Sequence, residues 1–293
     1  MVNIKTLKQN KPIKELLEFG IINIDKPSGP TSFQVSEFVK KSLGLRKTSH
    51  FGTLDPKVTG VLPVGLNRGC KLTGYFLGED KTYVGIGRIH GEVSIDKLKK
   101  TIKEKFVGKL KQTPPVKSRV KRQEREREVY SFKVLEKEEK DFLFEVKCQG
   151  GTYVRKLLDD LGKELGTGAH MLELRRTHAG IFSESDKEYP TINLYDFEKA
   201  VKEYKSGNEE LLRKIIIPAE IVSELHSIVE IKKEFVEKVL HGSPFLKSFL
   251  KKKVEKNKDE VVSVFSGEQF VGMFKVTEEG NIFARSEFSF QRI

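Results

Sequence analysis

One short segment of the chain, Ser49 to Gly60, has residue types that suit a catalytic loop. Asp55 stands directly before Pro56, and a residue before proline is disfavoured inside a helix. Gly52 and Gly60 permit tight backbone turns on either side of this pair. The segment therefore predicts a carboxylate carried on a loop, where a rigid scaffold often holds a catalytic group. An Asp-Pro pair alone is more often an ordinary turn, so the assignment depends on other parts of the chain.

Three further strings hold candidate site residues. Lys81-Thr82-Tyr83 places a tyrosine 28 positions beyond Asp55. A second string, Gly151-Thr152-Tyr153-Val154-Arg155, combines a glycine turn with an aromatic and a cationic side chain. A third joins Gly168-Ala169-His170 to Leu174-Arg175-Arg176.

Together these strings resemble the signature of the TruB family of RNA pseudouridine synthases. The family loop has the form Gly-Thr-Leu-Asp-Pro-x-x-Thr-Gly, and the match is residue by residue from Gly52 through Gly60. The other three strings follow in family order and spacing, so the resemblance covers residues 20 to 182. It implies an enzyme that isomerises uridine to pseudouridine within an RNA, without a cofactor or a metal.

The resemblance assigns the catalytic roles to Asp55, Tyr83 and Arg155. Asp55 is the nucleophile of the family, and covalent attack and deprotonation of the ribose both remain open for it. Either role requires an ionised carboxylate in a largely dry pocket, and a nearby cation favours the charged form. Arg155 is the expected partner, since a guanidinium matches a carboxylate in geometry. Tyr83 is expected to stack on the flipped uracil, with its hydroxyl near C5 as a proton acceptor.

The resemblance also implies a set of substrate-binding residues. Leu174 is expected to pack on the other side of the base, and His50 to hold the RNA open by stacking. Lys26 and Tyr153 complete the expected set. Simpler interpretations exist for each position: a core leucine, a solvated lysine, a half-buried tyrosine or a surface arginine.

Within the family, the chain is most similar to the dyskerin-like branch of archaea and eukaryotes. It has the Lys57-Val58 variant of the loop, a basic string from Pro114 to Arg122, and a short stretch between Tyr83 and Pro114. The resemblance implies that the partners are tRNA, rRNA, an H/ACA guide RNA and small H/ACA accessory proteins. A stand-alone synthase for the TΨC-loop uridine of tRNA and a non-catalytic RNA-binding scaffold are the alternatives.

Two features depart from the family pattern. Phe51 stands beside His50 where the family has a small serine or threonine. Residues 246–258 are rich in lysine where a more apolar stretch is expected. Two basic stretches, residues 117–127 and 247–258, suit a path for RNA phosphates and equally suit a solvated face.

The elements that must position these residues can be predicted from the local pattern. Residues 20–25 indicate a short strand that leads into a turn at 26–30, and Thr31 or Ser32 is suited to cap the helix that follows. Further strands are expected at 81–89, 129–135 and 142–146, and a helix at 152–165 that ends at Gly166. This mixture predicts an α+β fold with a largely antiparallel sheet.

We predict three parts of the chain. An N-terminal extension of residues 1–19 is followed by a catalytic domain at 20–222, with a helical region from 191 to 222. Residues 223–293 resemble a PUA domain, a small β RNA-binding module, with a helix at 232–240. Its strands are expected at 260–265, 269–276 and 281–284. The N-terminal extension is expected to pack on or near this module.

Composition is in keeping with an RNA partner. The chain has 293 residues, a formal net charge of +12 and a pI of about 9.4, and such an excess attracts polyanions. Two cysteines, Cys70 and Cys148, are too few for a disulfide framework or a structural zinc site. We find no membrane-spanning run, no signal peptide and no metal or nucleotide motif, and therefore expect a cytoplasmic protein.

Overall fold

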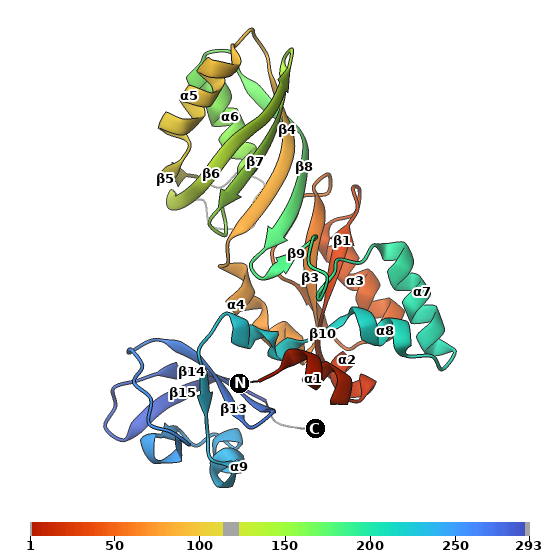
Figure 1. The fold of residues 1–293 in the computed structure, drawn as a ribbon, viewed down its shortest axis with the longest axis vertical. Helices are drawn as coiled ribbons and strands as arrows, with labels where there is room; N and C mark the ends of the chain where they lie inside the picture. The colour runs from red at the N-terminus through yellow and green to blue at the C-terminus, as the bar shows by residue number, and fades with distance from the viewer. Residues whose placement is uncertain (1, 114–122, 291–293) are drawn as a thin grey trace. The chain divides into compact units, whose positions relative to one another are not determined.

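The structure is a computed structural model that describes residues 2–113 and 123–290. The chain forms two compact units: a large unit, Ile21–Ile216, and a small unit that combines Met1–Gly20 with Ile217–Ile293 (Figure 1). The division between them falls inside two strands, β1 (Phe19–Lys26) and β10 (Ile216–Pro218). The first residues of the chain therefore belong with its C-terminal part.

The large unit is built on one sheet, whose strands from β1 onward run in the order β1-β3-β8-β4-β7-β6-β5. Strand β2 also pairs with β3, and β9 with β8. β3 and β8 pair in parallel, whereas the pairs β2–β3, β4–β7, β4–β8, β5–β6, β6–β7 and β8–β9 are antiparallel. The strands are β2 (Thr48–His50), β3 (Thr59–Asn67), β4 (Lys81–Ile89), β5 (Gly108–Gln112), β6 (Arg125–Glu138), β7 (Asp141–Cys148), β8 (Ala169–Ala179) and β9 (Phe182–Ser183).

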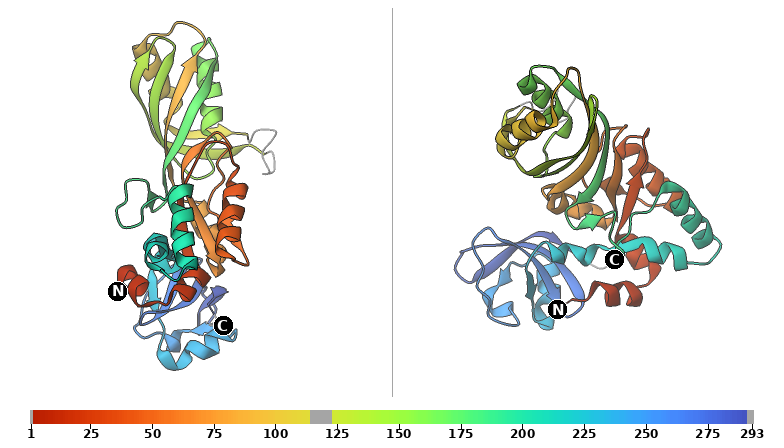
Figure 2. Two further views of the ribbon diagram at one scale, coloured as in Figure 1. Left: turned by 90° about the vertical axis from the view of Figure 1, so that its right-hand side faces the viewer. Right: turned by 45° about the horizontal axis from the view of Figure 1, so that its top comes forward.

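Two groups of helices cover this sheet. Helices α5 and α6 contact each other and pack against β6 and β8 respectively, while α3 packs against β2 and β3 (Figure 2). Helix α7 contacts α3, and Phe38 meets Phe197 edge to face there, with ring centroids 5.9 Å apart. The helices are α3 (Ser32–Leu43), α4 (Thr73–Leu77), α5 (Ile95–Lys105), α6 (Val154–Leu165), α7 (Leu194–Lys205) and α8 (Glu210–Ile215), with a 3-10 turn η1 (Arg68–Leu72).

Local sequence explains where the two site-bearing helices begin and end. Thr31 caps α3 by accepting from the backbone of Gln34, whose side chain accepts in return from the backbone of Thr31. α3 and α6 both end at a left-handed glycine, Gly44 and Gly166. A cap at Thr31 or Ser32 and the stop at Gly166 were predicted from sequence, because these signals are local.

The small unit is a five-stranded sheet in the order β11-β13-β14-β15-β12, parallel at β11–β13 and antiparallel elsewhere. Phe19 stacks on Phe270 at 5.4 Å, and Lys11 forms an ion pair with the buried Glu220. Its other elements are α1 (Ile4–Asn10), α2 (Ile13–Glu18), η2 (Ala219–Glu224), β11 (Ile228–Glu230), η3 (Lys233–Phe235), α9 (Val236–Leu240), β12 (Phe245–Leu246), η4 (Lys247–Phe249), β13 (Val261–Ser266), β14 (Gln269–Val276) and β15 (Ile282–Ser289).

The predicted fold class, α+β with a largely antiparallel sheet and a C-terminal β module, is confirmed. The helical region expected at 191–222 ends earlier, because the β-branched run from Ile215 to Ile217 before Pro218 favours an extended chain. The helix expected at 232–240 is split into η3 and α9. The basic string 114–122 lies outside the described residues, and in the described part of the chain no helix is long and apolar enough to cross a membrane.

Candidate active site

The loop that carries Asp55 lies between β2 and β3 and is held by backbone contacts along its length. The amide of Val58 donates to the carbonyl of Asp55 at 3.0 Å, which closes a turn over Pro56. Ser32, at the start of α3, binds Leu54 twice: its hydroxyl donates to the carbonyl at 3.0 Å and accepts from the amide at 2.8 Å. The residue before Asp55 is therefore fixed to a helix that the local sequence caps firmly.

Lys26, the last residue of β1, holds the other side of the same loop. Its side chain is fully buried, and its ammonium donates to the carbonyls of Pro27, Pro56 and Val58 at 2.8 to 2.9 Å. Burial lowers the pKa of Lys26, while the nearby charge of Asp55 raises it. Lys26 therefore acts on Asp55 through the backbone and through its charge, and its full burial argues against direct contact with RNA.

Both glycines that bracket the loop have positive φ and lie close to Arg176 on β8. Gly52 and Gly60 have φ values of +108° and +100°, in the region that favours glycine. A Cβ at Gly60 would lie 2.2 Å from the carbonyl oxygen of Arg176, and one at Gly52 would lie 3.2 Å from its Nη1. The glycines of the motif are thus explained by close approach of strand β8.

Asp55 pairs with Arg155, as the sequence predicted. Oδ2 of Asp55 lies 2.8 Å from Nη2 of Arg155, which stands in the first turn of α6. The two side chains are 51% and 60% exposed. The expectation of a dry pocket is therefore wrong for the protein alone, because the carboxylate lies on an open loop and water reaches both partners.

Tyr83 lies on β4, the neighbour of β8, and is 8% exposed. In the β4–β8 pairing it stands opposite Arg176, whose charge acts on the phenol. Burial raises the pKa of Tyr83, and the Arg176 guanidinium opposes the shift. The charge of Asp55 also raises the pKa of Tyr83, which places the phenol within electrostatic reach of the carboxylate.

Leu174 is buried two residues before Arg176 on the same strand. It stands opposite Gly85 of β4, and a Cβ at Gly85 would lie 2.8 Å from its Cδ1 and 2.7 Å from the ring of Phe144. Gly85 therefore leaves the space that the leucine fills. The side chain is 7% exposed, so it serves as a core leucine in the free protein.

His50 ends β2, Phe51 follows it, and the two differ in environment. His50 is partly exposed, and its Nε2 lies 3.2 Å from the hydroxyl of Thr53 in the Asp55 loop. Phe51 is buried and stacks on Phe76 at 4.9 Å between centroids, with planes 2° apart. A Cβ at Gly65 would come within 2.9 Å of the Phe51 ring, so the departure from the family pattern is accommodated in the core.

Tyr153 precedes α6 and is held through its backbone. The side chain of the buried Gln112 accepts from the amide of Tyr153 at 3.0 Å and donates to its carbonyl at 3.3 Å. The contact fixes the start of the helix that carries Arg155. The side chain of Tyr153 is partly buried.

Three supporting residues were given no part in the site from sequence. Ser32 and Arg176 hold the Asp55 loop, and Lys81 is buried two residues before Tyr83 on β4. The ammonium of Lys81 donates to the carbonyls of Leu77 and Glu79, and burial lowers its pKa to about 8. For Lys81 and Arg176 the sequence signal was their place inside the matched strings, but nothing in a string shows that its cations are buried.

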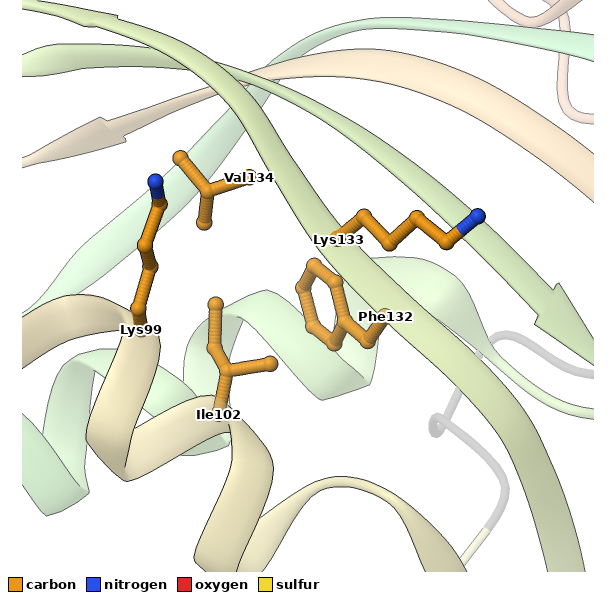
Figure 3. A pocket seen from close by; sticks show the side chains of 5 residues that line it. All are labelled: Lys99, Ile102, Phe132, Lys133 and Val134. Carbon is orange, nitrogen blue, oxygen red and sulfur yellow. The ribbon is translucent and has the colours of Figure 1, made fainter.

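A pocket of about 230 Å³ lies elsewhere, between α5 and β6 (Figure 3). Lys99, Ile102, Phe132, Lys133 and Val134 line it. None of the site residues lies there. Among the described residues, no group of three or more His, Cys, Asp or Glu side chains is arranged to hold a metal ion.

The lysine-rich segment of the small unit is partly paired with acidic residues. Lys251 lies 3.0 Å from Glu230, and Lys256 lies 2.8 Å from Glu260. This self-pairing reduces the charge that the segment can offer to phosphates.

Three family models match the chain. The model for the N-terminal domain of TruB family pseudouridylate synthases matches residues 40–154, and the model for the C-terminal domain of tRNA pseudouridylate synthase B matches residues 155–223. The model for the DKCLD (NUC011) domain matches residues 9–36. The matched ranges contain each residue of the candidate site.

Similar proteins include relatives and solved structures. A probable tRNA pseudouridine synthase B of Methanopyrus kandleri is 44% identical over 236 residues, which cover 80% of this chain and 68% of the relative. A chain in a solved Cbf5-Nop10-Gar1 complex has a TM-score of 0.88 and 38% identity, and the match covers 97% of this chain and 88% of that one. A chain in an H/ACA RNP solved with a substrate RNA containing 2'-deoxyuridine has a TM-score of 0.86 and 36% identity, with coverages of 97% and 89%.

Proposed function

The chain belongs to the TruB family of pseudouridylate synthases, and we propose that it isomerises uridine to pseudouridine in RNA with Asp55 as the nucleophile. The observation that carries the assignment is the ion pair of Asp55 with Arg155. Lys26 and Ser32 hold the loop on which Asp55 stands. These contacts place one carboxylate in a defined position, which is what catalysis by orientation requires.

The reaction breaks one bond and forms another on the same ribose. In the proposed sequence the Asp55 carboxylate attacks C1′, and the electron pair of the C1′–N1 bond leaves with the uracil. The uracil turns, its C5 bonds to C1′, and the carboxylate is released. The proton on C5 is lost toward the side of Tyr83, and N1 gains a proton. Atoms and electrons balance without a redox partner.

The exposure of Asp55 gives the RNA an active part in this scheme. A target base must leave its stack before the enzyme can reach it. When the flipped nucleotide covers Asp55 and Arg155, it excludes the water that now reaches both side chains. The attraction between the two charges then strengthens, because the local dielectric constant falls. We therefore propose that the dry pocket forms only in the complex.

We propose that the chain is the catalytic subunit of an H/ACA particle and acts on rRNA, tRNA or both. The similar structures support this, since they contain Cbf5 with Nop10 and Gar1, and an H/ACA RNP with substrate RNA. Stand-alone action on the TΨC-loop uridine of tRNA is the second candidate, and the names of the relatives favour it. A non-catalytic scaffold is disfavoured by the intact Asp55–Arg155 pair.

The role of the small unit and the cellular location of the protein are both predictions made from sequence. We propose that residues 223–293 act as a PUA-like RNA-binding module. Support comes from a sheet with its own buried core, which includes Val262, Val264 and Phe274. The cytoplasmic location stays a prediction.

The test is pseudouridine formation by the purified chain. A tRNA transcript and an rRNA fragment are each incubated with the chain, with and without guide RNA and accessory proteins, and pseudouridine is mapped by position. We expect guided, site-selective conversion of the rRNA fragment and some unguided conversion of the tRNA loop. Efficient, selective conversion of rRNA by the chain alone would contradict guide dependence, and no conversion of either RNA in any mixture would contradict the enzyme assignment.

A further inference from the structure

Arg176 is a buried side chain to which the proposed reaction assigns no role. It is 1% exposed, on strand β8. Its Nε donates to the carbonyl of Val61 at 2.8 Å, and its Nη2 donates to the carbonyl of Gly52 at 3.0 Å. Burial of a guanidinium is costly unless its donors find acceptors, and here two backbone carbonyls accept from it. The side chain therefore connects Val61, on the strand that follows the Asp55 loop, to Gly52 at the start of that loop.

Arg176 also stands opposite Tyr83 in the antiparallel β4–β8 pairing, directly after a register shift between Thr82 and Tyr83. The charge of the guanidinium opposes the rise in pKa that burial causes at Tyr83. Because a guanidinium has only donors, this charge favours an orientation in which the oxygen of Tyr83 faces it and the hydroxyl hydrogen is directed away.

The backbone of Arg176 completes the arrangement. Gly60 pairs with Arg176 in the parallel β3–β8 ladder, and the carbonyl of Arg176 occupies the space that a Cβ at Gly60 would need. One residue thus meets both glycines that bracket the Asp55 loop, through its side chain at Gly52 and through its main chain at Gly60. Strand β8, which carries Arg176, lies between β3 and β4 (Figure 1). Arg176 can therefore lie next to Gly60 on one side and Tyr83 on the other.

We infer that Arg176 is a positioning residue that holds the Asp55 loop and the Tyr83 hydroxyl in a single geometry for isomerisation. The inference rests on the proposed function. Arg176 does not contact the RNA itself, because its side chain is buried in the free protein. A lysine would retain the charge but not the planar fork that reaches several acceptors at once. Loss of Arg176 should therefore slow the chemical step without weakening RNA binding.

The test compares Arg176→Lys and Arg176→Met with the wild-type chain on one RNA. The dissociation constant for RNA and the single-turnover rate constant of pseudouridine formation are measured at a temperature where each variant is folded. We expect RNA affinity within about threefold of wild type for both variants. The rate constant of Arg176→Met is expected to fall by at least about 100-fold, the loss that a small misplacement of reacting groups can cause. Arg176→Lys is expected to recover part of that loss.

A merely structural role would move other quantities. If Arg176 only stabilised the fold, its loss would lower the melting temperature and the RNA affinity together with the rate constant. A rate constant within about threefold of wild type in both variants would overturn the inference outright. Arg88→Lys is the control: Arg88 is a bidentate arginine on β4, bound to Asp141 at 2.6 and 2.7 Å, and this variant should keep the wild-type rate.

A second measurement covers the case in which Arg176→Met fails to fold. Arg176→Lys is combined with Tyr83→Phe, which removes the hydroxyl of the residue opposite Arg176. If Arg176 acts through the hydroxyl, the lysine change costs less in the Tyr83→Phe background than in the wild type. Fully multiplicative losses would overturn the link to Tyr83. The wild-type rate in the same assay tests the proposed function separately.

Discussion

Nη2 of Arg155 lies 2.8 Å from Oδ2 of Asp55, yet both side chains are more than half exposed. An exposed ion pair contributes only about 0.2–1 kcal/mol to stability. The pair is therefore not a device for stabilising the fold of the free protein. On the function proposed above, its value lies in the complex, where bound RNA would exclude water from it.

The first prediction follows for Arg155→Ala. The free energy of unfolding should change by no more than about 1 kcal/mol, as for other exposed pairs. The single-turnover rate constant should fall by at least about 100-fold, because a preorganised charge is lost from the reacting centre. Denaturant unfolding and a quench assay measure the two quantities. Lys163→Ala, which breaks an exposed pair with Asp159 on the same helix, is the control and should keep the rate.

The second prediction concerns Gly60→Ala. The added Cβ would meet the carbonyl oxygen of Arg176 at 2.2 Å, at a φ of +100°. Strain of this backbone kind costs about 1–3 kcal/mol before the clash is counted. We expect a loss of at least about 2 kcal/mol in the free energy of unfolding, together with loss of activity. Urea titration followed by circular dichroism measures the stability.

Gly74→Ala provides the matched control for this substitution. Gly74 lies in α4, and a Cβ there would meet nothing within 4 Å. Alanine is favoured over glycine in a helix, so this variant should be as stable as the wild type or slightly more stable. If both alanine variants lose stability equally, the account of Gly60 is wrong.

The third prediction concerns the pH dependence of stability at Lys81. Burial lowers the pKa of Lys81 in the folded protein to about 8, from the usual value of 10.5. Between these values the unfolded chain binds more protons than the folded chain, so a rise in pH favours folding. The buried charge destabilises the folded protein by its full amount below pH 8, and this destabilisation decreases as the pH rises toward 10.5.

Comparison with Lys81→Met isolates this effect. From pH 7.5 to 9.5 the wild type should gain about 2 kcal/mol of unfolding free energy relative to the variant. Urea titrations at the two pH values measure the gain. Lys100→Met, a change at an exposed lysine on α5, should show a constant difference from wild type. A constant difference for Lys81→Met as well would contradict the lowered pKa.

Sequence alone predicted the elements whose signals are local. The Thr31 cap, the left-handed Gly166 and the alternation of β4 each depend on a few neighbouring residues. The Asp55–Arg155 pair was predicted from the family resemblance rather than from physics. The exposure of Asp55 was not foreseen, because solvent access depends on segments that are distant in sequence.

Sequence left Arg176 without a role and placed Lys26 among the substrate-binding residues rather than among those that hold the loop. The role of Arg176 depends on the parallel contact of β3 with β8, and the role of Lys26 on the fold of the loop around its ammonium. Both cations are buried, which is rare for unpaired charges and cannot be read from residue type. The family resemblance named the reacting groups, and the structure showed which residues hold them in place.

Asp55→Asn tests the central claim most directly. The amide is neither a nucleophile nor a base, and it retains the shape of the carboxylate. We predict RNA affinity within about threefold of wild type, since phosphate contacts dominate binding. Pseudouridine should be undetectable after long incubation with excess enzyme, while Asp160→Asn, at a partly exposed residue of α6, should remain active. Any site-specific pseudouridine formed by purified Asp55→Asn would contradict the assignment of Asp55 as the nucleophile.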